Sequence, residues 1–206
     1  MAPTPADLLE LADYRRRVAG LYAAVRAAPS ARAAWELWRA GRDELFGSHP
    51  QSALPEDARP SFAGLSYFAH DPAARVLAEV VPAEPRPHDI AAADGSTHAF
   101  TRFALARFEL AGESLELELY WLEGYAGGVF LPFADLTSGS ETYGGGRYLL
   151  DGAKGADLGL EGGRLVLDFN FAYHPSCAYD PRWACPLAPA ANRLPVALRA
   201  GERLPC

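Results

Sequence analysis

The alternation of apolar and polar residues between Phe100 and Trp121 restricts the fold of this chain more than any other feature of its sequence. Apolar side chains alternate with more polar ones up to a turn at residues 111–113, and the alternation resumes after it. A period of two is that of a strand with one buried face. The second strand turns Glu116 and Glu118 to its other face. The two segments therefore predict a half-buried β-hairpin.

The first 47 residues instead carry apolar side chains at the spacing of an α-helix. Thr4 is suited to cap one helix and Ser30 to cap a second. The apolar face of the second helix carries Trp35, Trp38, Leu45 and Phe46. We expect residues 1–47 to form a helical hairpin and residues 48–206 to form one antiparallel β domain. The expected fold is α+β and mainly β, with the hairpin packed on an antiparallel barrel or sandwich.

The other expected strands are short and are separated by segments rich in glycine and proline. A link at residues 82–87 contains three prolines, and Asp94–Gly95 marks a turn. The strands are expected at Leu65–Phe68, Arg75–Val81, Val129–Phe133, Tyr148–Leu150, Arg164–Ala172 and Leu194–Leu198.

Charge and cysteine content restrict the partners and the compartment. The formal net charge of −7 disfavours binding to nucleic acid or to an anionic membrane, since both require a positive field. Neither a signal peptide nor a bilayer-spanning apolar stretch is present, so we expect a cytoplasmic protein. The three cysteines, Cys177, Cys185 and Cys206, are an odd number, and we expect reduced thiols rather than a disulfide framework.

Several long and unusual runs of sequence lie in the second half of the chain. They are Leu131–Gly139, Glu141–Tyr148, Leu167–Tyr179, Cys185–Leu187 and Asn192–Leu194, with Ala200–Glu202 near the end and Trp38–Arg39, Arg42–Asp43 and Phe62–Leu65 upstream. Together they resemble the domain of unknown function 1684 family of bacteria and archaea over nearly the whole chain. The resemblance implies no particular activity. Where the family is expected to have Asn, this chain has His174.

Asp168 and Asn170 lie two residues apart on the expected strand at 164–172, so both side chains point to one face. A buried carboxylate needs a partner, and Arg147 is the candidate. The functional hypothesis is a pocket for a small polar or anionic ligand, formed by Arg147, Asp168 and Asn170 with Glu141 and Tyr143. The alternative is an internal hydrogen-bonded network that stabilises a unique fold.

The segment Gly144–Arg147 lacks the strand–loop–helix context of a nucleotide-binding loop. A tight turn or bulge is the simpler interpretation. A functional hypothesis also remains for this segment: its backbone amides and Arg147 could together bind a small anion.

His174, Cys177 and Cys185 are residue types that bind zinc, and Asp180 is a candidate fourth ligand. Their spacing matches no standard zinc motif, so no cofactor is the first expectation and zinc the alternative. The same residues suggest a thiol hydrolase with His174 as base, or a Cys177–Cys185 disulfide under oxidising conditions. Two buried thiols beneath a proline-rich loop are the simplest interpretation.

Three hypotheses for function follow. The first is a domain that binds a small molecule, and the second is a metal- or thiol-dependent hydrolase that uses His174, Cys177 and Cys185. The third makes the helical hairpin a docking surface for a partner or for a second copy of the chain.

Overall fold

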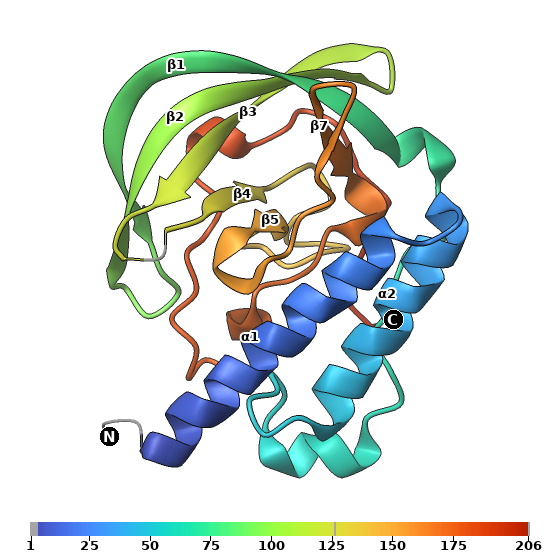
Figure 1. Cartoon of the computed structure of the whole chain (residues 1–206), viewed down its shortest axis with the longest axis vertical. Coiled ribbons are helices and arrows are strands. Elements are labelled where there is room, and N and C mark those ends of the chain that lie inside the picture. The colour runs from blue at the N-terminus through green and yellow to red at the C-terminus, as the bar shows by residue number, and fades with distance from the viewer. Residues whose placement is uncertain (1–3, 126, 206) are drawn as a thin grey trace.

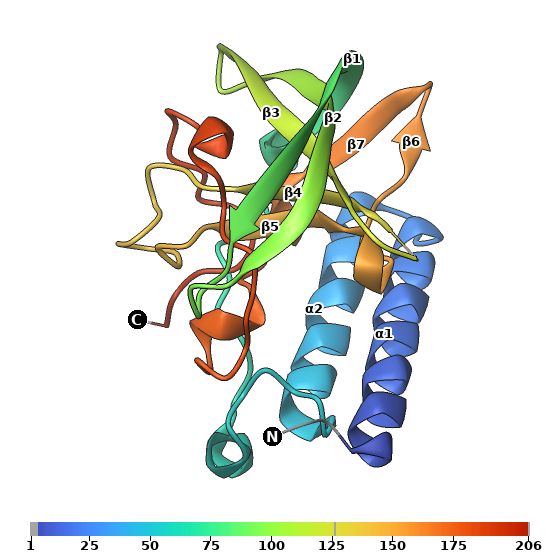
Figure 2. The ribbon, with the colours of Figure 1, turned by 90° about the vertical axis from the view of Figure 1, so that its left-hand side faces the viewer.

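Two helices pack against one antiparallel sheet in the computed structural model, which describes residues 4–125 and 127–205 (Figure 1). Helices α1 (Pro5–Arg26) and α2 (Ala31–Ser48) lie side by side, and both lie on the same side of the sheet (Figure 2). The seven strands have the order β5-β4-β3-β2-β1-β7-β6. Their bounds are β1 (Arg75–Ala91), β2 (Thr97–Leu110), β3 (Glu113–Leu122), β4 (Val129–Phe133), β5 (Arg147–Asp151), β6 (Leu160–Glu161) and β7 (Arg164–Asp168).

The predicted α+β class, with a helical hairpin packed on antiparallel β-structure, is confirmed. The sheet begins at β5 and ends at β6, and these two edge strands do not pair with each other. It is therefore an open sheet rather than a closed barrel. Six 3₁₀ turns of the described residues complete the fold: η1 (Glu56–Ser61), η2 (Pro72–Ala74), η3 (Gly152–Lys154), η4 (Phe169–Phe171), η5 (Ser176–Ala178) and η6 (Ala190–Asn192).

Both helices begin at the predicted caps. The Thr4 hydroxyl accepts the Asp7 amide at 3.2 Å, and the Asp7 carboxylate accepts the Thr4 amide at 2.8 Å, which forms a capping box. The Ser30 hydroxyl accepts the Ala33 amide at 3.2 Å. The apolar face of α2 then buries Trp38 completely, beside Tyr22 of α1. No helix of the described residues is long and apolar enough to cross a bilayer.

The predicted hairpin is formed by β2 and β3. Ala111 and Gly112 connect the strands with φ of 54° and 81°, the two positive values that a two-residue type I′ turn requires. Leu117 is fully buried, whereas Glu116 lies on the other face and pairs with Arg107 at 2.7 Å.

Four of the expected strands were wrong: the strands at 75–81 and 164–172 have other bounds, and two more are absent. The link at residues 82–87 belongs to β1, which absorbs the prolines with a register shift between Pro82 and Arg86. Strand β7 pairs with β1 only over residues 75–78, so one side of β1 is open beyond that point and tolerates residues without an amide hydrogen. Residues 65–68 and 194–198 are not strands, because only isolated backbone bonds, such as Leu194 to Ala134, connect them to the fold.

Candidate functional site

Arg147 is fully buried, and protein groups satisfy most of its guanidinium. Its Nη2 atom lies 2.7 Å from Oδ2 of Asp135 and 2.9 Å from the carbonyl oxygen of Leu198, and its Nη1 atom donates to the carbonyl of Ala200. The predicted pairing of Arg147 with Asp168 is therefore wrong. Burial lowers the pKa of Arg147, an effect that the carboxylate of Asp135 opposes. These contacts attach the C-terminal segment to β5.

Asp168 and Asn170 do lie together, but not on one face of a strand. Strand β7 ends at Asp168, and Asn170 lies in turn η4. The turn brings the side-chain amide of Asn170 back to Asp168, where it donates to Oδ1 at 2.8 Å. The other hydrogen bonds of the Asn170 side chain are with the backbone of Asp71. The predicted convergence of Arg147, Asp168 and Asn170 is thus wrong, because a turn replaces the last part of the expected strand.

Asp168 nevertheless lines an open groove of about 520 Å³ between the helical hairpin and β7. Burial raises the pKa of its carboxyl group. The two arginines that also line this groove are already paired, Arg26 with Asp157 at 3.6 Å and Arg75 with Glu161 at 2.6 Å.

Glu141 and Tyr143 point to different neighbours. Glu141 is half exposed and pairs with Arg199 at 2.8 Å. The hydroxyl of Tyr143 lies 3.8 Å from Sγ of Cys177. Between Tyr143 and Arg147 the chain makes the tight turn expected of Gly144–Arg147, since the Gly146 amide donates to the Tyr143 carbonyl. A Cβ at Gly146, where φ is 92°, would lie 2.5 Å from the carbonyl oxygen of Phe133.

His174 is buried and hydrogen-bonded away from the cysteines. Its Nε2 atom accepts the Tyr143 amide at 3.2 Å, and its Nδ1 atom lies 3.6 Å from Glu202. Burial, with the charges of Arg147 and Arg42, lowers the pKa of His174 to about 3. The ring is therefore neutral, and the Nε2 lone pair that a base for Cys177 would need is engaged.

The described part of the chain contains no group of three or more His, Cys, Asp or Glu side chains arranged to hold a metal ion. The expected set of His174, Cys177 and Cys185 is split, because the imidazole faces Glu202 while Sγ of Cys185 accepts the backbone amide of Cys177. Asp180, the candidate fourth ligand, pairs with Arg182 at 3.1 Å. Cys206 lies outside the described residues.

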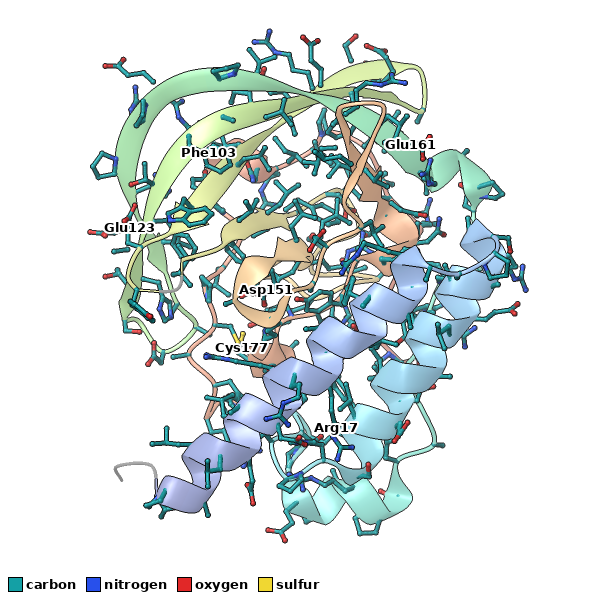
Figure 3. All side chains as sticks on the ribbon, viewed as in Figure 1. Arg17, Phe103, Glu123, Asp151, Glu161 and Cys177 are labelled. Atoms are coloured by element: carbon teal, nitrogen blue, oxygen red, sulfur yellow. The ribbon has the colours of Figure 1, made fainter. Side chains whose placement is uncertain are left out.

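A cavity that is more enclosed and more apolar than the groove beside Asp168 lies elsewhere, and sequence reasoning missed it. It is a cleft of about 300 Å³ whose lining includes Asp151, which is labelled in Figure 3. Helix α1, the ends of β2 to β5, turn η3 and the loop 176–186 enclose it. Its walls are mostly apolar and aromatic, and they include Leu11, Tyr14, Phe100, Leu122, Val129, Phe130, Tyr148, Trp183, Cys185 and Pro186.

Lys154 contributes a cation to this cleft. It is the chain's single lysine, and its Nζ donates to Oδ2 of Asp151 at 2.6 Å while the side chain stays 30% exposed. Burial disfavours its charge, but the charge of Asp151 prevails and raises the pKa of Lys154. Two glycines allow turn η3 to lie close to β4. A Cβ at Gly152 would lie 2.7 Å from the Val129 amide nitrogen, and one at Gly128 would lie 2.9 Å from the backbone of Gly152.

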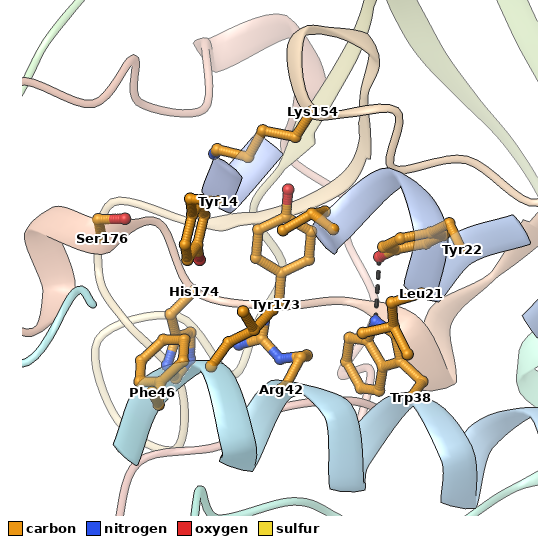
Figure 4. Close-up of a pocket in the computed structure, with 12 residues that line it drawn as sticks. Tyr14, Leu21, Tyr22, Trp38, Arg42, Phe46, Lys154, Tyr173, His174 and Ser176 are labelled. Carbon is orange, nitrogen blue, oxygen red and sulfur yellow. Dashed lines mark hydrogen bonds between the residues drawn. The ribbon is translucent and has the colours of Figure 1, made fainter. Parts of the chain in front are cut away.

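A second, smaller cavity adjoins the cleft, and both are lined by Tyr14, Lys154 and Ser176 (Figure 4). It has a volume of about 30 Å³, room for about one water molecule. Arg42 and His174 also line it, and Arg42 pairs with buried Glu202 at 2.6 Å. Lys154 thus lies where the two cavities meet.

The fold and the cleft define a class of protein: an α+β domain in which a helical hairpin and an open antiparallel sheet enclose a mostly apolar cavity. Residues 60–203 match the model of the family described as protein of unknown function (DUF1684). The chain belongs to that family, which confirms the resemblance found in its motifs.

The chain is also similar to a solved structure. The chain is 39% identical to an uncharacterized protein of Haloarcula marismortui whose structure was determined by solution NMR. The match has a TM-score of 0.60 and covers 81% of this chain and 90% of that chain. A comparison with curated proteins gives no match.

Proposed function

We propose that the protein binds a small organic anion with an apolar body, and that the cleft around Lys154 is the binding site. The observation that carries this proposal is the combination of a mostly apolar cavity of about 300 Å³ with a cation, Lys154, in its lining. Pockets for small molecules have this character, with apolar walls and a few polar groups that fix the orientation of the ligand.

The charges of the cleft favour an anion. Its charged lining residues are Arg15, Lys154 and Asp151, so cations outnumber carboxylates there although the whole chain has a net charge of −7. Arg15 lies exposed on the rim of the cleft and forms no ion pair with the described residues. A ligand carboxylate can accept hydrogen bonds from Lys154, since an ammonium group has three donors and Asp151 uses one.

Two hydroxyl groups would orient the head of the ligand. Tyr14 and Ser176 line both cavities, and their hydroxyls make no hydrogen bond within the described part of the chain. The hydroxyl of Tyr148, by contrast, already donates to the carbonyl of Pro186. The ligand head therefore belongs near Lys154, Tyr14 and Ser176, and its apolar body belongs against the aromatic wall of the larger chamber.

The hydrolase alternative has less support. Its thiol form requires His174 to act on Cys177, and Nε2 of His174 is engaged by the Tyr143 amide. Its metal form requires a cluster of ligands that the described residues do not contain.

Calorimetric titration with decanoate and decanol tests the proposal, because the two probes share an apolar chain and differ in charge. Lys154→Met removes the cation and keeps an unbranched side chain of similar length. We expect the variant to bind decanoate at least about tenfold more weakly, or about 1.4 kcal/mol, with decanol nearly unaffected. Arg15→Met should weaken decanoate binding less. Arg16→Met is the matched control, because Arg16 pairs with Asp13 outside the cleft.

Equal losses for the two probes would mean that Lys154 acts on the shape of the cleft and not by its charge. Decanoate binding that Lys154→Met leaves intact would contradict the proposal.

A further inference from the structure

The loop that borders the cleft contains two free cysteines, and the sulfur of one touches the backbone of the other. Cys177 lies in turn η5, and its backbone amide donates to Sγ of Cys185 at 3.3 Å. Both side chains are half buried, so reagents in solution reach them. Cys185 also lines the cleft.

The contacts of the two sulfur atoms make them chemically unequal. A hydrogen bond from Cys185 lowers the pKa of Cys177 to about 7, and the same bond raises the pKa of Cys185. The Cys177 thiol donates to the Tyr143 hydroxyl at 3.8 Å, and once Cys177 ionises the same hydroxyl can donate to the thiolate, which also lowers the pKa of Cys177. Cys177 is therefore the sulfur that ionises near neutral pH, while Cys185 keeps its proton. This is the division between an attacking and a resolving cysteine.

We propose that Cys177 and Cys185 are a redox-active dithiol that reduces small-molecule disulfides and closes a reversible disulfide beside the cleft. The Cys177 thiolate attacks one sulfur of the disulfide, forms a mixed disulfide and releases the first thiolate. Cys185 then loses its proton and attacks Sγ of Cys177, which releases the second thiolate. The protein loses two electrons and two protons, and the small disulfide becomes two thiols. This site is independent of the proposed function.

The positions of the two residues suit this bond. Because Sγ of Cys185 already lies 3.3 Å from the backbone nitrogen of Cys177, rotation of the side chains with a small backbone shift brings the sulfurs to the bond length of about 2.05 Å. Both residues lie in the segment 175–189, which has no β-strand and contains only one short 3₁₀ turn, so the backbone there accommodates such a shift at little cost.

The test uses the full chain with Cys206→Ser, so that two cysteines remain, and oxidised glutathione as the probe. Intact-mass spectrometry should show the protein losing two hydrogen atoms, with a glutathione adduct only as a transient species. In the Cys185→Ser variant the adduct on Cys177 should accumulate instead, because the resolving thiol is missing. In the Cys177→Ser variant adduct formation should be several-fold slower.

A second comparison does not depend on how stable the disulfide is. The Cys185→Ser variant keeps a hydrogen-bond donor, its hydroxyl, next to Cys177. The Cys185→Ala variant has no such donor. Alkylation of Cys177 by iodoacetamide at pH 7 should therefore be about threefold slower in the alanine variant, since a lower thiolate fraction is partly offset by higher nucleophilicity. Equal alkylation rates, or persistent adducts on both cysteines without an internal disulfide, would overturn the proposal. Circular dichroism establishes that each variant is folded.

Discussion

Replacing Arg147 by Met should destabilise the fold strongly. Both partners of the Arg147–Asp135 pair are fully buried, with a distance of 2.7 Å. The substitution leaves the charge of Asp135 without its partner, and the carbonyls of Leu198 and Ala200 lose their donor. Breaking a buried ion pair by removing one partner costs about 3–5 kcal/mol. At about 2–4 °C of melting temperature per kcal/mol for a chain of this size, the expected decrease is roughly 6–20 °C.

Equilibrium unfolding in urea, followed by tryptophan fluorescence, measures this loss. The matched control is Arg199→Met, which removes an arginine from the exposed pair with Glu141 and should change the unfolding free energy little. The double variant Arg147→Met with Asp135→Asn should recover part of the loss, because no charge is then buried without a partner. A loss for Arg147→Met no larger than that of the control would refute the assignment of Arg147 to the folded core.

Three further results are expected. Burial raises the pKa of Glu202 to about 7, so the folded state binds its proton more tightly than the unfolded state, and the resulting stabilisation is lost as pH rises from about 4.5 to 7. Urea titrations of wild type and of Glu202→Gln over that range should show this loss of stability as the difference between the two proteins. The comparison is needed because His174, whose pKa is lowered, makes both proteins more stable as pH rises toward about 6.5. Gly146→Ala should destabilise the protein by more than 1 kcal/mol, because its Cβ would meet the Phe133 carbonyl at 2.5 Å. Gly20→Ala, at an open position in α1, should stabilise it by about 0.5–1 kcal/mol in the same assay.

The parts of the fold that the sequence predicted well depend on local patterns. The capping residues Thr4 and Ser30 and the alternation through β2 and β3 each determine structure within a few neighbouring residues. The prolines of β1 misled the prediction, because a proline is excluded from a strand only where its missing amide would face a partner. Whether a strand edge is paired there depends on β7, which comes much later in the chain.

The site was harder to predict because its residues come from distant segments. Arg147 was correctly expected to need a carboxylate, but only the packed structure decides between Asp135 and Asp168. The cleft joins Tyr14 to Lys154 and Cys185, and no spacing rule connects these positions. The one local signal was that Lys154 is the only lysine among 19 basic residues. A general preference of the chain for arginine over lysine explains that equally well, so it did not point to a site.

The most direct test of the proposed ligand site is a titration of ¹⁵N-labelled protein with decanoate, followed by the chemical shifts of the backbone amides. If the account is correct, the largest changes occur in turn η3 at residues 152–154, at Ser176 and around Tyr14, and Lys154→Met reduces them. Changes centred instead on the groove beside Asp168, or no saturable change at any amide, would contradict it.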